Sequence, residues 1–208
     1  MKTLSIDEIV RLVRTKYDEI GPNESEMIGD TDDLNFNKVV RSCITDAYRF
    51  VVNSADLSML EGKSLQAEIT IDDNLTAYID LPDDFLRGIT ARLSSWQSSA
   101  MGFITEDAPE YRMQSDPYAC GTYQCPVAAL VHTPNGRKIE LYKARTKQDT
   151  LLSLVYAPMI KDSDSNVEIP DMLAESFIYY VAALTATTFR EDVANDFFKV
   201  AKSIIGVE

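Results

Sequence analysis

Histidine is nearly absent from this 208-residue sequence, which contains only His132. Any acid–base or triad mechanism that depends on histidine would have to use that residue. It lies between Val131 and Thr133, in an expected strand just before a turn, where a structural or surface role is more common than catalysis. The sequence also lacks a nucleophile elbow, a phosphate-binding glycine loop with lysine, and a zinc-protease helix motif. We therefore expect no enzyme activity and no cofactor.

Cysteine is scarce as well, with only Cys43, Cys120 and Cys125. An odd number of cysteines at long, irregular spacing does not resemble the dense disulfide framework of small secreted domains, so reduced thiols are expected. Cys120 and Cys125 lie near His132, but their spacing is loose and the sequence offers no obvious fourth zinc ligand. Buried or loop thiols are the better interpretation.

Basic residues and long apolar runs are also lacking. The chain has 20 Lys and Arg against 33 Asp and Glu, a formal net charge of −13. Affinity for nucleic acid comes chiefly from cation contacts, so the charge balance disfavours a conventional DNA- or RNA-binding protein. The sequence shows no apolar run of the length that a signal peptide or membrane span requires. We expect folding and assembly in the cytoplasm, without a membrane.

With 45% hydrophobic residues, the chain can bury a substantial core, and its first part predicts two amphipathic helices. Ser5 and Glu8 have capping-box spacing, and Leu4 is placed to pack on Ile9. Gly21-Pro22 predicts the end of this helix, and a polar stretch follows over residues 23–33. The second helix is expected to end near Asn53-Ser54. The two apolar stripes contain Ile6, Ile9, Val13, Tyr17 and Ile20, and Phe36, Val40, Cys43, Ala47 and Phe50.

The period then changes from helical to alternating. Residues 65–81 predict a β-hairpin that turns at Asp73-Asn74, and a third strand follows Pro82 up to Trp96. Residues 97–126 lack sustained periodicity and predict either an excursion with a short helix near Tyr111 or a mobile loop.

A second hairpin is expected where residues 127–133 and 138–143 flank Pro134-Asn135-Gly136, because Asn-Gly supplies the positive φ angles of a tight turn. Residues 151–156 form the last predicted strand. Two helices follow in succession, the first of which begins near Pro170. Their apolar stripes contain Leu173, Phe177, Tyr180, Val181 and Leu184, and then Val193, Phe197, Val200, Ala201 and Ile204.

These elements predict an α+β fold in which two N-terminal and two C-terminal helices form a helical bundle, with a central antiparallel β-rich region between them in the sequence. The predicted helical part comprises residues 1–64 and 157–208. The β-rich part comprises residues 65–156, with the excursion at 97–126.

One loop matches part of a calcium-binding pattern. Asp162, Asp164 and Asn166 provide the alternating oxygen ligands with which such a loop begins. However, Val167 replaces the required glycine and Leu173 replaces the bidentate glutamate. A solvated loop before a helix is the alternative.

Two segments resemble phage proteins of the head-to-tail connector, in particular the adaptor and tail tubular protein A type. The segment Ala77–Arg87 resembles their strand that closes on Leu-Pro-x-Asp-Phe. The segment Val167–Leu173, running into Phe177–Ala183, resembles the helix that begins at a proline after their last strand. The order of the elements is also similar over most of the chain.

The resemblance implies a structural virion protein that forms a ring, commonly dodecameric, below the portal protein and above a downstream tail or ring protein. Such a ring would line the DNA ejection channel and let genomic DNA pass without specific binding. It would sit at the head–tail junction of the virion after assembly in the host cytoplasm. Residues that match the motifs, expected to be structural, are Leu81, Pro82, Phe85, Ile169 and Pro170.

Two other function classes remain open at this point. A carbohydrate- or host-binding module of a phage tail could use exposed aromatic side chains, and Trp96 with Tyr111, Tyr118 and Tyr123 would support it. A hydrolase could use paired carboxylates such as Asp83 and Asp84, although aspartates beside a turn usually bind local backbone groups.

Overall fold

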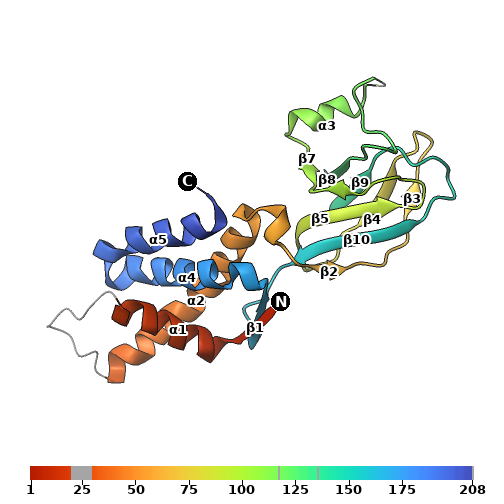
Figure 1. The fold of residues 1–208 in the computed structure, drawn as a ribbon. Helices are drawn as coiled ribbons and strands as arrows, with labels where there is room; N and C mark the ends of the chain where they lie inside the picture. Colours follow the sequence, from red (N-terminus) through yellow and green to blue (C-terminus); the bar gives the residue numbers. More distant parts are fainter. Residues whose placement is uncertain (20–29, 117, 135, 208) are drawn as a thin grey trace. The chain divides into compact units, whose positions relative to one another are not determined.

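The computed structural model describes residues 1–19, 30–116, 118–134 and 136–207 (Figure 1). These residues form five α-helices and mainly antiparallel sheets, which confirms the α+β class. The chain divides into two compact units. We call Met1–Glu61 with Met159–Glu208 the helical unit, and Gly62–Pro158 the β unit. The β unit is one continuous segment, whereas the helical unit takes residues from both ends of the chain.

The first helix, α1, spans Ile6–Glu19 and begins as its sequence predicts. The Ser5 hydroxyl oxygen accepts the Glu8 backbone N–H at 3.1 Å, which satisfies one of the free donors of the first turn. Leu4 and Ile9 are fully buried, as expected for the hydrophobic contact across the cap. The predicted end at Gly21-Pro22 lies outside the described residues.

The second helix, α2, spans Asp30–Ser54. Its C-terminal end lies at the predicted position, but its first residue lies inside the stretch that we expected to be a polar loop. Aspartate is favourable in the first turn because it faces the positive end of the helix dipole, so a run of aspartates can begin a helix. Most of the predicted apolar stripe is buried, including Phe36, Val40, Ala47 and Val51.

Two further helices follow the β unit. A short 3₁₀ turn, η2 (Asp171–Leu173), leads into α4 (Ala174–Phe189), and α5 spans Glu191–Ile205. Helix α4 packs against α1, α2 and α5. Val200 on α5 was expected on the buried stripe but is 38% exposed. The buried residues of α5 are Val193, Ala194, Phe197, Ala201 and Ile205, so its buried stripe is narrower than its apolar residues suggest.

The stretch Asp171–Phe189 is long and apolar enough, by length and composition alone, to cross a membrane. This differs from the expectation that the chain has no run of that kind. More than half of this stretch is buried within the helical unit, as is common for the core helix of a soluble protein. Its apolar character therefore has an explanation in the packing against the neighbouring helices.

The helical unit also contains two strands that the sequence did not predict. Strand β1 (Lys2–Ser5) pairs antiparallel with β11 (Asn166–Ile169), from Lys2 opposite Ile169 to Ser5 opposite Asn166. One side of this two-stranded ribbon is almost completely buried, with the side chains of Leu4, Val167 and Ile169. It ties the start of the chain to the segment that leads into α4.

The β unit contains two sheets and a short helix. The four-stranded sheet has the order β2-β10-β5-β6, and the five-stranded sheet has the order β3-β4-β9-β8-β7. All neighbours are antiparallel except β7 and β8, which are parallel. The strands are β2 (Lys63–Ser64), β3 (Thr70–Ile71), β4 (Ala77–Asp80), β5 (Phe85–Leu93), β6 (Ala100–Met101), β7 (Ile104–Thr105), β8 (Ala128–Thr133), β9 (Gly136–Leu141) and β10 (Leu151–Pro158).

Both predicted hairpins are present. Strands β3 and β4 pair around the Asp73-Asn74 turn, where the Asp72 carboxylate accepts the backbone N–H groups of Asn74 and Thr76. Residues 65–69 lie outside any strand, so the first arm is shorter than predicted. In the second hairpin, Gly136 has φ 117°, as a tight turn requires, while Asn135 lies outside the described residues.

The excursion 97–126 is folded rather than simply a loop. It contributes β6, β7 and the predicted short helix, α3 (Pro109–Met113), which contains Tyr111. The backbone N–H of Gln97 donates to the Tyr123 carbonyl at 2.9 Å, and the Ser98 hydroxyl donates to the Gln124 carbonyl at 2.5 Å. These bonds hold the two ends of the excursion together.

Candidate functional site

The first family-like motif lies at the corner between the two sheets. Strand β4 belongs to the five-stranded sheet and β5 to the four-stranded one, so Leu81 to Asp84 carry the chain from one sheet to the other. The Phe85 N–H donates to the Pro82 carbonyl at 3.1 Å, which closes a turn. Proline fits here because it fixes φ and has no N–H to place in a strand ladder.

Phe85 anchors this corner in the core. Its side chain is 4% exposed, and its ring stacks on Tyr156 at 5.5 Å and on Phe103 at 6.3 Å between centroids. Leu81 packs against the same core and is partly buried. Leu81, Pro82 and Phe85 therefore lie together at a structural joint.

The two carboxylates beside this corner, those of Asp83 and Asp84, have different surroundings. Asp84 accepts a hydrogen bond from the Tyr156 hydroxyl at 2.8 Å and lies 3.6 Å from the Lys63 ammonium. Asp83 is exposed. The Asp84 carboxylate thus joins the motif to β10 and β2 and has the environment of a structural residue.

The second motif lies where β11 leads into α4. Ile169 is fully buried, and its neighbour Pro170 is also buried. The Pro170 carbonyl accepts the Leu173 N–H at 2.9 Å, which opens the 3₁₀ turn before α4. The two residues fix the direction in which the chain enters the central helix of the helical unit.

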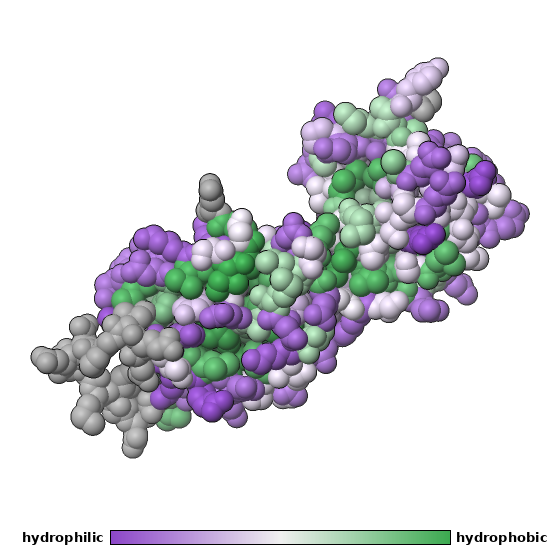
Figure 2. Space-filling view, in the orientation of Figure 1, coloured by the Kyte–Doolittle hydropathy of each residue, from purple (hydrophilic) through white to green (hydrophobic). Residues whose placement is uncertain are grey.

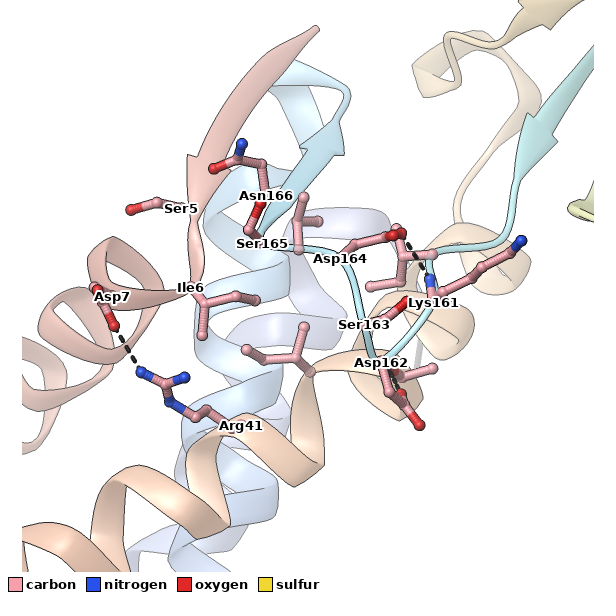
Figure 3. Close-up of a pocket in the computed structure, with 14 residues that line it drawn as sticks. Ser5, Ile6, Asp7, Arg41, Lys161, Asp162, Ser163, Asp164, Ser165 and Asn166 are labelled. Carbon is pink, nitrogen blue, oxygen red and sulfur yellow. Dashed lines mark hydrogen bonds and ion pairs between the residues drawn. The ribbon is translucent and has the colours of Figure 1, made fainter.

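The loop with the partial calcium pattern lines a pocket of about 520 Å³ in the helical unit (Figure 3). Asp162, Asp164 and Asn166 point in different directions in this view. Asp162 accepts the Thr45 hydroxyl of α2 at 2.5 Å, and Asp164 accepts the Lys161 N–H at 2.9 Å. Each of these carboxylates has a separate local partner, so the loop is held to α2 and to itself.

The same pocket contains an ion pair between the first two helices. Arg41 of α2 donates to the Asp7 carboxylate of α1 at 2.7 Å. Both side chains are more than half exposed, so the pair contributes little to stability. Within the described residues, no three His, Cys, Asp or Glu side chains are grouped so that they could hold a metal ion.

His132 and the cysteines occupy ordinary positions. The His132 side chain is 71% exposed, and its Nδ1 lies 3.1 Å from a Glu106 carboxylate oxygen. Cys43, Cys120 and Cys125, all in the described part of the chain, are thiols outside any disulfide. Burial raises the pKa of the Cys43 thiol, which lowers its reactivity.

Trp96 does not have the exposure that the carbohydrate-binding alternative requires. Its side chain is 2% exposed in the core of the β unit, and its indole N–H donates to the Lys143 carbonyl at 3.1 Å. Tyr111 and Tyr123 are partly buried, whereas Tyr118 is 99% exposed. Of the aromatic side chains proposed for that role, only Tyr118 presents a free ring face.

A polar cluster that the sequence analysis missed lies under α3. The hydroxyls of Tyr111 and Tyr142 both donate to the Glu140 carboxylate, the former at 3.4 Å, and the Tyr78 hydroxyl donates to Asp72 at 3.2 Å. The cluster lines a pocket of about 600 Å³. Tyr78, Glu140 and Tyr142 come from two neighbouring strands and the residue after one of them, and Tyr111 comes from α3, so no spacing in the sequence could have indicated the group.

The cluster keeps its phenols protonated. Burial and the nearby Glu140 carboxylate raise the pKa values of Tyr111 and Tyr142 above the ordinary value. Burial, with Asp72 and Glu140, raises the pKa of Tyr78 to about 12. Of the three neutral hydroxyls, that of Tyr111 links α3 to Glu140 on β9.

Alkaline titration should therefore loosen the β unit. The folded pKa of Tyr78 lies above the unfolded value of 10.0, so its contribution to stability is complete below about pH 10 and is lost as the pH rises to about 12. We expect Tyr78→Phe to lose less stability than the wild type over this interval, measured by denaturant unfolding at each pH. The exposed Tyr118→Phe is the control and should follow the wild type. Equal losses in Tyr78→Phe and the wild type would contradict the assignment.

Among the described residues, the tyrosine cluster, the Asp84 corner and the Asp162 loop each hold segments of the chain together through hydrogen bonds. The motif residues lie where the chain changes direction. No known protein-family model matches the sequence, and no curated protein shows significant similarity to it.

Proposed function

We propose that the chain is a structural subunit of a phage head-to-tail connector, which forms a ring, commonly a dodecamer, below the portal protein. The observation that carries the proposal is the insertion of a β unit, residues 62–158, into a helical unit built from both chain ends. The two connector-like motifs coincide with the corner between the sheets and the entrance to α4. In this proposal the four long helices act as the bundle of the ring body.

The charge distribution supports a channel role for the helical unit. Its sequence has 21 acidic and 11 basic residues, whereas the β unit has 12 and 9. Most of the net charge of −13 therefore belongs to the helical unit. An acidic lumen repels the phosphate backbone, so DNA can slide without specific binding. We infer that this unit faces the lumen of the virion channel, between the portal and a downstream tail or ring protein.

Electron microscopy of the purified chain, alone and mixed with a phage portal protein, tests the proposal. We expect closed rings stacked on the portal, with acidic side chains of the helical unit lining the lumen. Particles that never form a ring and leave the portal bare would overturn the connector role. A ring with a basic lumen would overturn the proposed orientation of the helical unit.

A further inference from the structure

The β unit exposes apolar side chains on its excursion. Met113 on α3 is 49% exposed, and Tyr118 shortly after it is 99% exposed. Figure 2 shows light green among purple in the region of α3. Exposed large side chains of this kind are typical of a contact surface when they lie on one segment. We call residues 106–116 together with Tyr118 the arm.

The arm is also the source of the net charge of the β unit. It contains four acidic residues and one basic residue, and the rest of the β unit has eight of each. Asp107, Glu110 and Asp116 are exposed. The arm therefore combines two exposed large side chains, Met113 and Tyr118, with a net negative charge.

The arm has a fixed shape before it meets a partner. The Gln114 side-chain oxygen accepts the Gly121 N–H at 2.9 Å, and Asp116 accepts the Tyr118 N–H at 2.8 Å. The Tyr111–Glu140 bond joins α3 to β9. A surface that is ordered in advance loses less conformational entropy on binding.

The same unit carries a surface of opposite charge. The segment 143–147, which we call the basic loop, contains Lys143, Arg145 and Lys147 and no acidic residue. Arg145 and Lys147 are exposed. Leu152, 56% exposed at an irregularity in the β5–β10 pairing, follows shortly after and adds an apolar side chain.

The basic loop is likewise held in place by contacts with other residues of the same unit. The Asp149 carboxylate accepts the Arg145 N–H at 2.8 Å and the Thr146 hydroxyl at 3.0 Å. The Arg145 guanidinium lies over the Tyr123 ring, and Lys147 pairs with Asp73. The Lys147–Asp73 pair is exposed and therefore weak, so Lys147 can exchange its partner at small cost.

We propose that the arm of one subunit binds the basic loop of a second copy of this chain. The formal charges of the arm and the loop are equal and opposite, at −3 and +3, and Met113 and Tyr118 on the arm and Leu152 near the loop add exposed apolar side chains. Two different surfaces on each copy can pair head-to-tail, and such a contact generates a ring when the rotation closes. Because the helical unit is strongly acidic, copies repel one another there, and a local attraction must offset this repulsion. The inference rests on the proposed function.

Charge reversal in the full chain tests the contact. The arm variant carries Glu106→Lys and Glu110→Lys, and the loop variant carries Lys143→Glu and Lys147→Glu. Sedimentation velocity should show wild-type self-association that weakens as NaCl is raised. Each variant alone should associate at least about tenfold more weakly than the wild type, because like charges then meet in every contact.

Mixing the two variants distinguishes this contact from a general effect of charge. In an equimolar mixture, the positive arm of one variant faces the negative loop of the other, so association should return toward the wild-type level. The controls Glu68→Lys with Asp83→Lys, and Lys38→Glu with Lys199→Glu, change the net charge equally on exposed residues elsewhere and should keep the wild-type association.

Three outcomes would overturn the inference: a wild type that stays monomeric at low salt, variants that associate like the wild type, or a mixture that does not recover. Rings that form on the portal with either variant alone would reject this contact and leave the connector role intact. A chain that never binds the portal would reject the connector role itself.

Discussion

Phe85→Ala should destabilise the β unit by about 3–5 kcal/mol, one of the two largest effects that we expect from a single substitution. The Phe85 ring is 4% exposed and stacks between Tyr156 and Phe103, so its removal loses apolar burial and leaves a cavity at the corner between the sheets. Trp96, the only tryptophan, is buried in the same core. Its fluorescence during denaturant unfolding therefore measures the stability of this unit.

The matched control for this substitution is Tyr118→Ala, which also removes an aromatic ring from the β unit. Because Tyr118 is 99% exposed, its replacement should change the free energy of unfolding by less than about 0.5 kcal/mol. If Phe85→Ala unfolds at the same denaturant concentration as this control, the corner does not depend on the ring. The motif at Leu81 to Phe85 would then lack the structural role that we assign to it.

Phe177→Ala should cost the helical unit a similar amount, about 3–5 kcal/mol. Phe177 is fully buried on α4 and meets the Tyr48 ring of α2 edge-to-face at 6.3 Å. Since α4 packs against α1, α2 and α5, a cavity beside its first turns weakens the contacts on which the unit depends. Far-UV circular dichroism follows the loss of helix during denaturant unfolding.

Phe189→Ala provides the control on the same helix. Its ring lies near the C-terminal end of α4 and is 44% exposed, so truncation should cost clearly less than at Phe177. Because the chain has two compact units, Phe177→Ala should act on the helical signal more than on Trp96 fluorescence. An equal cost at both positions would show that α4 is not the centre of the helical core.

Local sequence was sufficient to predict the structure wherever the backbone conformation depends on neighbouring residues. The Ser5 cap, the C-terminal end of α2, the turn at Asp72 to Thr76 and the alternation of β5 were all predicted, because their partners lie within a few residues. The α+β class follows from the same periodicities. The calcium-like pattern at Asp162 to Asn166 shows the limit: the spacing is locally correct, but the side chains bind separate partners.

Tertiary structure decided what no local pattern contains. The β1–β11 ribbon joins strands of four residues that are far apart in the chain, and Trp96 is buried because two sheets close over it. Tyr111 likewise joins the tyrosine cluster only when α3 folds toward β9, where its hydroxyl reaches Glu140. The sequence by itself determined the positions of the longer helices and of the two hairpins, the acidic charge and the lack of catalytic motifs. Packing between distant segments decided which side chains meet and which stay exposed, because burial depends on the partner that covers a residue.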